Sequence, residues 1–415
     1  MDLRSGEPYF VVRDGPVMSH APLAGDASCD VLVVGAGITG ALTAYRAAQA
    51  GMSVIVLDKR NAARGSTAAS TAIMQYEIDT PLAELGGLIG AEDAALAYRL
   101  CYDAIGELSV LVQEIEGVEG VDCELRRVGS LYVASSAEDA EGFAEEVRLR
   151  QSAGIKAEVV KGGEVAVRFG IRGGQGGKGD AIYSTNAATV NAYRLAHALL
   201  HRCVGMGVRV HGATCVTELE RRGEGIIART EAGPTVRAKH AVVCTGYEAA
   251  GMFKEPVVEL MSTYAMATAP VRGEPGGGRS GTFPPRCVVW ESARPYLYVR
   301  STGDGRAIVG GEDEPIVEAG ARDALIARKC KRLAERAREL FTGSEVEAEM
   351  GWAGTFGETR DGLAYIGESP EHAGVLFNLG FGGNGMTFAL IGAGLVVEVM
   401  KSGRPSELRL FRFGR

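Results

Sequence analysis

Three short segments of the chain are continuously apolar, at residues 31–34, 54–57 and 241–244. Such runs are typical of parallel β-strands that are covered on both faces. Between the first two runs, residues 40–50 carry small side chains that would let a helix pack closely against a sheet. We therefore predict a strand–helix–strand unit at the start of a parallel sheet, which the third strand joins from far along the chain.

Other segments show a different pattern of apolar and polar positions. Residues 94–116 and 137–151 repeat apolar side chains with helical spacing among mixed charges. Residues 387–400 form the longest apolar run, and we expect a buried helix there, because a bilayer span needs about 20 residues. The remaining expected elements are a strand at 127–135, a strand-rich segment at 288–300 and a basic amphipathic helix at 321–340.

The order of these segments predicts an α/β fold with two domains. A Rossmann-like dinucleotide-binding domain is assembled from separated pieces, and a substrate domain with a large mixed sheet, of the α+β type, interrupts it twice. The expected bounds are 29–84, 181–252 and 345–402 for the dinucleotide-binding domain, 85–180 and 253–344 for the substrate domain, 1–28 for an N-terminal extension and 403–415 for a C-terminal tail.

A glycine motif follows the first predicted strand, in the sequence Asp30-Val-Leu-Val-Val-Gly35-Ala-Gly37-Ile-Thr-Gly40. In this G-x-G-x-x-G turn, Gly35 permits the tight turn, Gly37 lets the backbone approach a pyrophosphate, and Gly40 lets the helix pack on the strand. The helix then presents free N–H groups and the positive end of its dipole to phosphates. Asp58 ends the next predicted strand, where a carboxylate would accept the ribose hydroxyls and disfavour a 2′-phosphate. The motif predicts NAD or FAD and argues against NADP.

A loop rich in hydroxyl groups comes soon after Asp58, in the sequence Arg64-Gly65-Ser66-Thr67-Ala68-Ala69-Ser70-Thr71. Its small side chains suit a segment that runs beside phosphates or a flavin ring, and they suit a solvated turn equally well. The loop by itself does not choose between NAD and FAD.

Composition narrows the classes of function. With 46% hydrophobic and 23% charged residues, the 415-residue chain has the composition of an ordinary folded protein. The net charge of −8 is spread along the chain without a Lys/Arg stripe, so we expect no nucleic-acid partner. The eight cysteines stand far apart, with no C-x-x-C pair and no histidine at zinc-ligand spacing, and the first 29 residues carry no secretory signal. These features predict reduced thiols, no metal site and a cytoplasmic location.

Two later motifs complete the pattern, Gly351-Trp-Ala-Gly-Thr-Phe-Gly-Glu-Thr-Arg-Asp-Gly-Leu-Ala-Tyr-Ile-Gly367 and Leu379-Gly-Phe-Gly-Gly-Asn-Gly-Met-Thr387. Together with the glycine turn and with residues 241–246 and 298–311, they resemble the D-amino-acid-oxidase-like flavoproteins, the group that contains glycine oxidase, sarcosine oxidase and γ-glutamylputrescine oxidase. The resemblance spans nearly the whole chain. It implies FAD as the cofactor and a substrate domain whose sheet roofs the flavin.

The resemblance also implies where the cofactor binds. The Gly-Gly-Asn-Gly turn before residues 387–400 would stabilise the negative charge of reduced flavin, and Val216 would meet the adenine end with its backbone. Attachment is expected to be noncovalent, because sarcosine oxidases use a cysteine near the Trp352 motif and this chain has no cysteine after Cys330. The expected cofactor-binding residues are Gly35, Gly37, Ile38, Thr39, Gly40, Asp58, Lys59, Arg60, Ser66, Thr67, Ser70, Thr71, Val216, Thr245, Gly246, Gly354, Gly382, Gly383, Asn384, Gly385, Met386 and Thr387.

On the substrate side, the resemblance implies an arginine on a roof strand, near a tyrosine, that holds the substrate carboxylate bidentately. Arg300 occupies that position and follows Tyr296 and Tyr298. Glycine-oxidase-like enzymes have Arg-Pro where this chain has Phe356-Gly357, and histidine where it has Phe381. Arg360 would compensate, and the alternative is a substrate amine that lacks an α-carboxylate. The expected catalytic residues are Arg300, Tyr298, Tyr296 and Arg360.

Aromatic and acidic side chains flank the same strand and the hydroxyl-rich loop. Trp290 and Glu291 precede the roof strand, and Tyr76 and Glu77 follow the loop. An aromatic wall with a carboxylate would suit a cationic amine or a polyamine tail. A tryptophan at such a position is, however, more often simply part of the hydrophobic core.

The resemblance implies FAD-dependent oxidation of an amine or amino acid. A hydride passes from the carbon that bears the nitrogen to flavin N5, giving an imine and, with O₂ as acceptor, H₂O₂. Two alternatives stay open: a dehydrogenase of a hydroxy acid or amine that uses a quinone or protein acceptor, and a non-catalytic flavin-binding subunit. The sequence leaves open the substrate, the electron acceptor and whether the chain forms a homo-oligomer.

Overall fold

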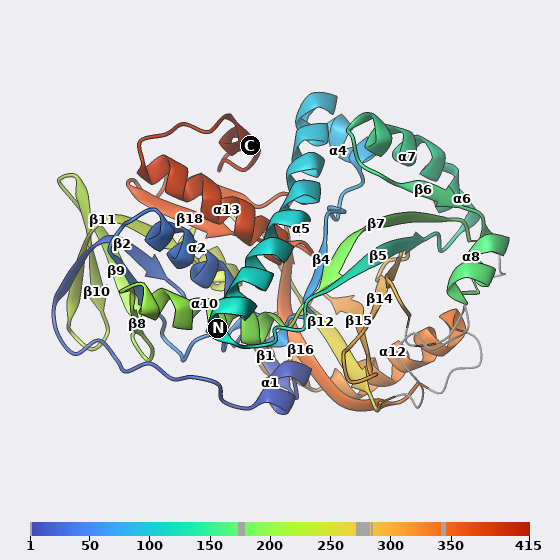
Figure 1. Cartoon of the computed structure of the whole chain (residues 1–415), viewed down its shortest axis with the longest axis horizontal. Coiled ribbons are helices and arrows are strands. Elements are labelled where there is room, and N and C mark those ends of the chain that lie inside the picture. Colours follow the sequence, from blue (N-terminus) through green and yellow to red (C-terminus); the bar gives the residue numbers. More distant parts are fainter. Residues whose placement is uncertain (1, 173–178, 271–282, 284, 342–345) are drawn as a thin grey trace.

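Two β-sheets organise the computed structural model, which describes residues 2–172, 179–270, 283, 285–341 and 346–415 (Figure 1). The eight-stranded sheet of the described residues lies on the left in Figure 1, and the ten-stranded sheet lies on the right. The long helix α5 (Ala91–Glu119) runs between them. The chain crosses between the sheets several times, so each sheet combines segments that are distant in sequence.

The eight-stranded sheet has a parallel centre, as the continuous apolar runs predict. Strand β2 pairs in parallel with β3 on one side and with β11 on the other, where Leu32 faces Ile55 and Ala241. Antiparallel strands are added only at the edges. The strands are β2 (Ala27–Val34), β3 (Val54–Leu57), β8 (Arg209–His211), β9 (Val216–Arg222), β10 (Gly225–Thr230), β11 (Thr235–Val243), β17 (Tyr365–Glu368) and β18 (Val375–Leu379).

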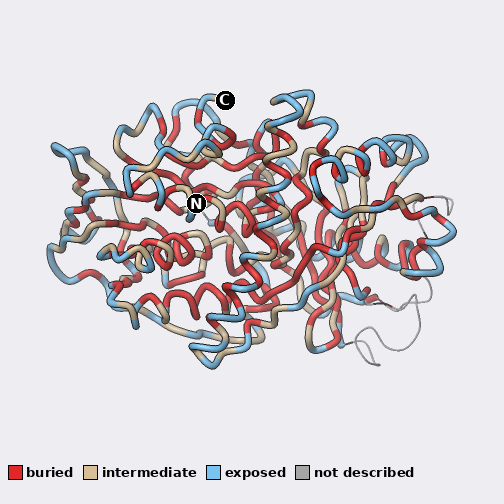
Figure 2. Tube along the Cα trace, turned by 45° about the horizontal axis from the view of Figure 1, so that its top comes forward, coloured by how far each residue is buried: buried red, intermediate tan, exposed pale blue. Residues whose placement is uncertain are grey.

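Helices cover one face of this sheet, and side chains on the other face, such as Leu32 and Ile55, are buried in a second cluster, so the central strands are apolar on both sides. Helix α2 (Ile38–Gln49) packs against α10 (Ala192–Gly205) and α13 (Gly385–Met400). Helix α5 packs on α10 and α13 (Figure 1). Close packing is possible because α2 buries small residues such as Ala41 and Ala44. The buried stretches in Figure 2 run through the middle of the molecule, with exposed segments around them.

The ten-stranded sheet is antiparallel except where β13 pairs in parallel with β5. One of its faces is covered by helix α12 (Ile326–Leu340), whose apolar side packs on the central strands. Its other face turns toward the eight-stranded sheet. The strands are β1 (Arg4–Gly6), β4 (Ile73–Gln75), β5 (Arg126–Val133), β6 (Glu158–Val160), β7 (Ala181–Thr189), β12 (Glu259–Thr268), β13 (Val288–Glu291), β14 (Leu297–Ser301), β15 (Ala307–Glu314) and β16 (Ala348–Glu358).

The remaining helices are short and connect these elements. Two segments expected as single helices are each divided, the first at Gly142 and the second between Asp323 and Ile326. The connecting helices are α1 (Tyr9–Asp14), α3 (Ser66–Ala69), α4 (Leu82–Ile89), α6 (Ala137–Glu141), α7 (Phe143–Ser152), α8 (Gly162–Phe169), α11 (Ala319–Asp323), η1 (Gly246–Met252) and η2 (Ser406–Leu410).

The sheets divide the chain differently from the expected domain bounds. Strands β7 and β16 fall within the pieces 181–252 and 345–402, which were expected in the dinucleotide-binding domain, yet both pair in the ten-stranded sheet. Helix α5 falls within the piece 85–180, expected in the substrate domain, yet it packs on the helices of the eight-stranded sheet. Strand partners and helix neighbours depend on pairings over long sequence distances, which local patterns do not encode.

Both chain ends are integrated into the fold. In the segment expected as an N-terminal extension, β1 pairs with β16, and Tyr9 and Phe10 are fully buried. In the expected C-terminal tail, Phe411 is buried and Arg415 forms an ion pair with Asp361 at 2.7 Å.

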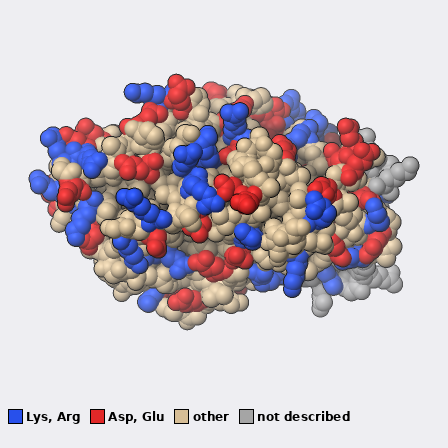
Figure 3. Space-filling model, turned by 90° about the horizontal axis from the view of Figure 1, so that it is seen from above, with Lys and Arg blue, Asp and Glu red and all other residues tan. Residues whose placement is uncertain are grey.

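The surface and the helices show two further features. On the face seen in Figure 3, basic and acidic side chains are interspersed. Among the described residues, every helix falls short of the length or the apolar character that a membrane span requires.

Candidate active site

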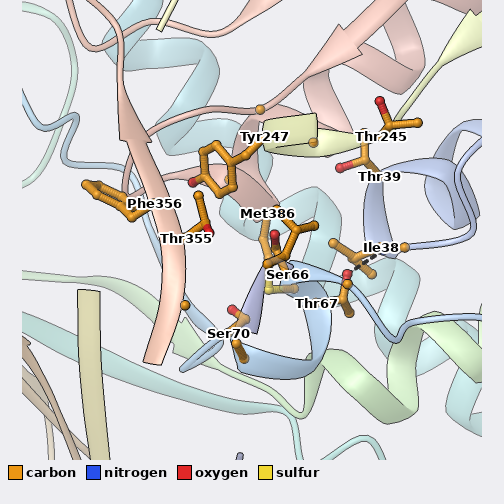
Figure 4. Close-up of a pocket in the computed structure, with 18 of the residues that line it drawn as sticks. Ile38, Thr39, Ser66, Thr67, Ser70, Thr245, Tyr247, Thr355, Phe356 and Met386 are labelled. Atoms are coloured by element: carbon orange, nitrogen blue, oxygen red, sulfur yellow. Dashed lines mark hydrogen bonds between the residues drawn. The ribbon is translucent and has the colours of Figure 1, made fainter. Parts of the chain in front are cut away.

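A cavity of about 430 Å³ lies between the two sheets (Figure 4). One wall is the edge at which the parallel strands β2, β3 and β11 end, represented by Val34, Leu57 and Cys244. The opposite wall is the inner face of the ten-stranded sheet, including Trp290 and Tyr298. The carboxyl edge of a parallel sheet, where the connections diverge, is the usual ligand site of such folds, and the volume is in the range of cofactor pockets.

The glycine turn forms the start of the cavity and needs its glycines for three separate reasons. Gly35 has a φ of +110°, and a Cβ atom on it would lie 2.6 Å from the Cys244 carbonyl oxygen. A Cβ on Gly40 would lie 1.8 Å from the carbonyl oxygen of Gly35, so Gly40 keeps helix α2 against the turn. Gly37 lines the cavity and precedes the first residue of α2. The turn at Gly35 and the close packing at Gly40 are as the motif predicts, and the approach of a pyrophosphate to Gly37 stays a prediction.

Asp58 holds the turn from the end of the neighbouring strand. Its carboxylate accepts hydrogen bonds from the N–H groups of Ala36 and Arg60, both at 2.7 Å. Burial raises the pKa of Asp58, although these two N–H groups favour its ionised form. The side chain also lines the cavity, as expected for an acceptor of ribose hydroxyls.

The hydroxyl-rich loop lies beside the glycine turn. It forms the short helix α3, and the Thr67 hydroxyl accepts a hydrogen bond from the Ile38 N–H at 3.0 Å, the dashed line in Figure 4. The buried hydroxyl oxygen of Ser66 has no hydrogen-bond partner among the described residues, although Ser66 lines the cavity. A buried hydroxyl without a partner is costly, so a polar ligand group is expected at this position.

The Gly-Gly-Asn-Gly turn closes the cavity at the start of α13. Gly382 has a φ of +78°, and Gly382, Gly383 and Gly385 line the cavity. The N–H of Gly383 donates to the carboxylate of Asp79 at 2.7 Å. A Cβ atom on Gly383 would lie 2.6 Å from the same carboxylate, so glycine is required for this contact.

Aromatic side chains from the ten-stranded sheet and from η1 line the other end. Tyr296 and Tyr298 lie with ring centres 5.8 Å apart, and Trp290 stacks on Tyr132. Tyr247, which Figure 4 shows near Thr355, stacks on Phe381 with centres 5.5 Å apart. Phe381 is thus a buried support for Tyr247.

The predicted carboxylate-binding arginines do not reach the cavity. The Arg300 guanidinium is 1% exposed and donates to the carbonyl oxygens of Thr71, Ala72 and Val190 at 2.9–3.0 Å. Arg360 is exposed on the turn after β16 and lies outside the cavity wall. Neither arginine is therefore placed to bind a substrate in the cavity, and the Arg300 guanidinium instead meets Phe10 and the loop before β4.

A different arginine lines this end of the cavity. Arg294, in the loop between β13 and β14, is exposed, and its guanidinium lies 5.3 Å from the centre of the Tyr296 ring. Among the described residues it has no hydrogen-bond or ion-pair partner. Arg294 is therefore the cavity arginine that is free to bind an anionic group.

The expected acidic partners of the aromatic wall also lie elsewhere. Glu291 pairs with Arg336 on helix α12, and Glu77 is buried at 4.0 Å from Arg150. Neither Glu77 nor Tyr76 lines the cavity, whereas Trp290 does.

Comparison with known proteins fits this geometry. Residues 30–399 match the family described as FAD dependent oxidoreductase. The chain belongs to this family of flavoenzymes. It is 26% identical to glycine oxidase of Bacillus licheniformis, over 87% of this chain and 89% of the relative. It is also 26% identical to D-amino acid dehydrogenase 2 of Ralstonia nicotianae, over 91% of this chain and 97% of the relative.

A solved structure has the same fold. The crystal structure of glycine oxidase from Geobacillus kaustophilus superposes with a TM-score of 0.75 at 20% identity, covering 94% of this chain and 99% of the other. Family membership makes FAD the cofactor, and the cavity residues fit it: a glycine cradle, a strand-end carboxylate and an unpartnered buried hydroxyl.

Nearly all of the residues expected to bind FAD line the cavity. Those on its wall are Gly35, Gly37, Ile38, Thr39, Asp58, Lys59, Arg60, Ser66, Thr67, Ser70, Thr71, Val216, Thr245, Gly246, Gly354, Gly382, Gly383, Gly385 and Met386. Gly40 lies outside it in its packing role. Asn384 and Thr387 lie behind the wall, where both side chains donate to the carbonyl oxygen of Gln75, at 2.9 and 3.1 Å.

Sequence reasoning missed several cavity residues. Tyr247 lies in η1, shortly after the end of β11, and a position after a parallel strand was a signal that would have identified it. The sequence around Asp79, Thr263 and Arg294 gave no such signal. Asp79 lies in a bend, Thr263 in β12 and Arg294 in a loop, and only the fold brings these three regions together. Within the described residues, no cluster of histidine, cysteine and acidic side chains is suited to hold a metal ion.

Proposed function

We propose that this flavoenzyme oxidises an amine or amino acid at the carbon that bears the nitrogen. The observation that carries the proposal is the continuous cavity, which joins the glycine cradle at Gly37 to the tyrosines and Arg294 on the roof sheet. A ligand held at the cradle and a small substrate at the roof would share one enclosed space. Bound FAD supplies the hydride acceptor in this family.

An amino acid is the substrate class that the cavity favours. Two of the relatives are named glycine oxidase and D-amino acid dehydrogenase 2. Arg294 offers a guanidinium without an ion-pair partner among the described residues, and such a fork matches a carboxylate bidentately. In this proposal Arg294 takes over the role expected of Arg300.

The tyrosines would position the substrate between Arg294 and the cradle. Tyr296, just before β14, and Tyr298, within it, line the cavity, and burial raises the pKa of both phenols, which keeps them as neutral hydrogen-bond donors. Reaction then depends on orientation of the substrate in a space from which the aromatic side chains exclude water. A neutral amine needs no dedicated base for hydride loss.

We propose that FAD is bound noncovalently. The cysteines on the cavity wall are Cys215 and Cys244, which lie next to Val216 and at the end of β11, near the nucleotide end of the cradle. Burial raises the pKa of the Cys244 thiol to about 12, so it stays protonated and unreactive at neutral pH. All eight cysteines are free, which supports a location in the reducing cytoplasm.

The first test is the visible spectrum of the purified protein before and after acid precipitation. A two-band flavin spectrum whose colour stays in the supernatant is expected, followed by anaerobic bleaching with amino acids or amines. A flavoprotein that dithionite bleaches but that no amine, amino acid or hydroxy acid bleaches would contradict the proposal and favour a non-catalytic subunit.

The electron acceptor separates oxidase from dehydrogenase. One relative is named D-amino acid dehydrogenase 2, so dehydrogenase activity is the second candidate. Stoichiometric H₂O₂ in air identifies an oxidase. Turnover that requires an added quinone, without peroxide, identifies a dehydrogenase.

A further inference from the structure

The first strand of the chain borders the cofactor cavity. Leu3, the residue before β1, lines the cavity wall and is 4% exposed. The match to the FAD dependent oxidoreductase family covers residues 30–399, so this part of the wall lies outside the matched region. The residues expected to bind FAD begin at Gly35, and none of them belongs to this strand. We call residues 2–6, which contain β1, the β1 segment.

Hydrogen bonds from two elements fix the β1 segment in place. On one side it pairs with β16, where the N–H of Thr355 donates to the carbonyl oxygen of Leu3 at 2.8 Å. On the other side, the fully buried guanidinium of Arg322 on α11 donates to the carbonyl oxygen of Asp2 at 2.9 Å and to the Ser5 hydroxyl. The position of Leu3 on the cavity wall is therefore set by the folded sheet and by α11.

The side chain of Leu3 lies against the hydroxyl-rich loop. A Cβ atom on Gly65 would lie 3.5 Å from Cδ1 of Leu3, which is ordinary van der Waals contact. The next loop residue, Ser66, lines the same cavity as Thr355 of β16 (Figure 4). The buried hydroxyl of Ser66 has no hydrogen-bond partner among the described residues. Leu3 thus stands beside the position at which a polar group of the ligand is expected.

Arg4 brings a positive charge to the same side of the cradle. Its Nε donates to the carbonyl oxygen of Arg64 at 3.1 Å, which ties the β1 segment to the hydroxyl-rich loop. Burial and the charge of Arg64 lower the pKa of Arg4, and the charge of Arg60 on the cavity wall acts in the same direction. Positive charges that gather in this way favour an anionic group near them, such as the pyrophosphate of FAD.

We propose that the β1 segment is part of the FAD site and that the Leu3 side chain contacts the bound cofactor. The inference depends on FAD as the cofactor of the family and is independent of the substrate that is oxidised. Because the β1 segment and FAD share one wall of the cavity, each stabilises the position of the other. Bound FAD should protect the strand, and loss of the strand should speed the release of FAD.

The first test replaces the contacting side chain. Leu3→Ala is expected to raise the Kd for FAD, measured by titration of the deflavinated protein, by about tenfold, which is the scale for removing two buried methyl groups. Thermal unfolding with and without saturating FAD separates contact from packing. A role in packing alone would lower both Tm values equally, whereas loss of an FAD contact reduces the difference between them.

Leu23 provides the matched control. It also precedes β2, is 7% exposed and belongs to the same buried cluster as Leu3, but it does not line the cavity. Leu23→Ala is expected to lower Tm by the same amount with and without FAD, and to leave the Kd for FAD unchanged.

Two further measurements address the strand as a whole. In the unaltered protein, amide hydrogen exchange in residues 3–6 is expected to be slower with FAD bound than without it. Deletion of residues 2–6 is expected to speed the release of FAD from the holoenzyme, followed by the rise in fluorescence of free FAD. The exchange measurement needs no variant, so it tests the inference even where the deletion prevents folding.

The outcomes separate this inference from the proposed function. A Kd for FAD that Leu3→Ala leaves unchanged, or that Leu23→Ala raises equally, would overturn the contact between Leu3 and FAD. Equal hydrogen exchange in residues 3–6 with and without FAD would overturn the coupling of the β1 segment to the cofactor. Bleaching of the flavin by amino acids or amines is a separate measurement, so either result leaves the proposed function standing.

Discussion

The guanidinium of Arg300 donates a hydrogen bond to the carbonyl oxygen of Val190 at 3.0 Å. The same nitrogen also donates to the carbonyl oxygens of Thr71 and Ala72, both at 2.9 Å. Strand β14, the hydroxyl-rich loop and the end of β7 are therefore tied together by one buried cation. Burial lowers the pKa of Arg300 to about 10, so it remains charged at neutral pH while it satisfies these carbonyls.

Replacing Arg300 is expected to affect stability before catalysis. Arg300→Gln leaves buried carbonyl oxygens without a donor and should lower the free energy of unfolding by about 2–4 kcal/mol. Urea unfolding of the protein without FAD measures the effect. Unchanged stability with a lost affinity for amino acids would instead restore Arg300 to the substrate site.

Replacing Arg294 is expected to have the opposite effect. Arg294 is exposed and makes no hydrogen bond to the described residues, so Arg294→Gln should leave unfolding unchanged. Loss of a charge-assisted hydrogen bond to a carboxylate should raise KM for amino acids by about 10–100-fold. The corresponding amines without a carboxylate serve as the control and should show little change; an equal effect on both would contradict carboxylate binding by Arg294.

Replacing Gly37 is expected to abolish FAD binding without unfolding the chain. Its φ of −78° is accessible to any residue, and a Cβ atom there would meet Thr67 at 3.0 Å. The branched side chain of Gly37→Val would project into the space where the pyrophosphate is expected. The flavin absorbance per protein should fall to near zero with the folded circular dichroism spectrum retained.

A glycine on the surface provides the control for this variant. Nothing lies within 4 Å of a Cβ atom on Gly87, which is exposed on α4. Gly87→Ala should retain a full complement of FAD. A Gly37→Val protein that does the same would contradict the position of the cradle.

The raised pKa of Asp313 predicts how its removal changes stability with pH. Its folded pKa of about 6 exceeds the ordinary value of 3.8, so the folded state binds more protons in this window and loses stability as pH rises from about 4 to 6. Asp313→Asn removes this loss and should be more stable than the parent protein above pH 6, by an amount on the order of 2 kcal/mol.

Thermal unfolding of the two proteins without substrate, at pH 4 and pH 8, checks this sign. The variant should gain at pH 8 and lose that advantage at pH 4. An advantage that is the same at both pH values would show that the carboxyl does not titrate in this range.

Local patterns were sufficient for the elements that form the cofactor cradle. The run at residues 54–57 is β3 with the same bounds, and the glycine spacing placed the turn between β2 and α2. Local patterns failed where helices are interrupted, as at Gly142, since apolar spacing continues through the break. They also failed for Arg300, whose side chain donates to carbonyl acceptors away from the cavity.

The sequence by itself determined the dinucleotide cradle, because a turn, its glycines and the strand-end carboxylate of Asp58 are fixed by short-range geometry. Only the tertiary structure decided the substrate end. There Asp79, Thr263 and Arg294 line the cavity together, although Asp79 lies more than two hundred residues before Arg294, and Thr263 stands opposite a bulge in β15. Side-chain direction after a bulge depends on the partner strand, and that pairing is a property of the folded sheet.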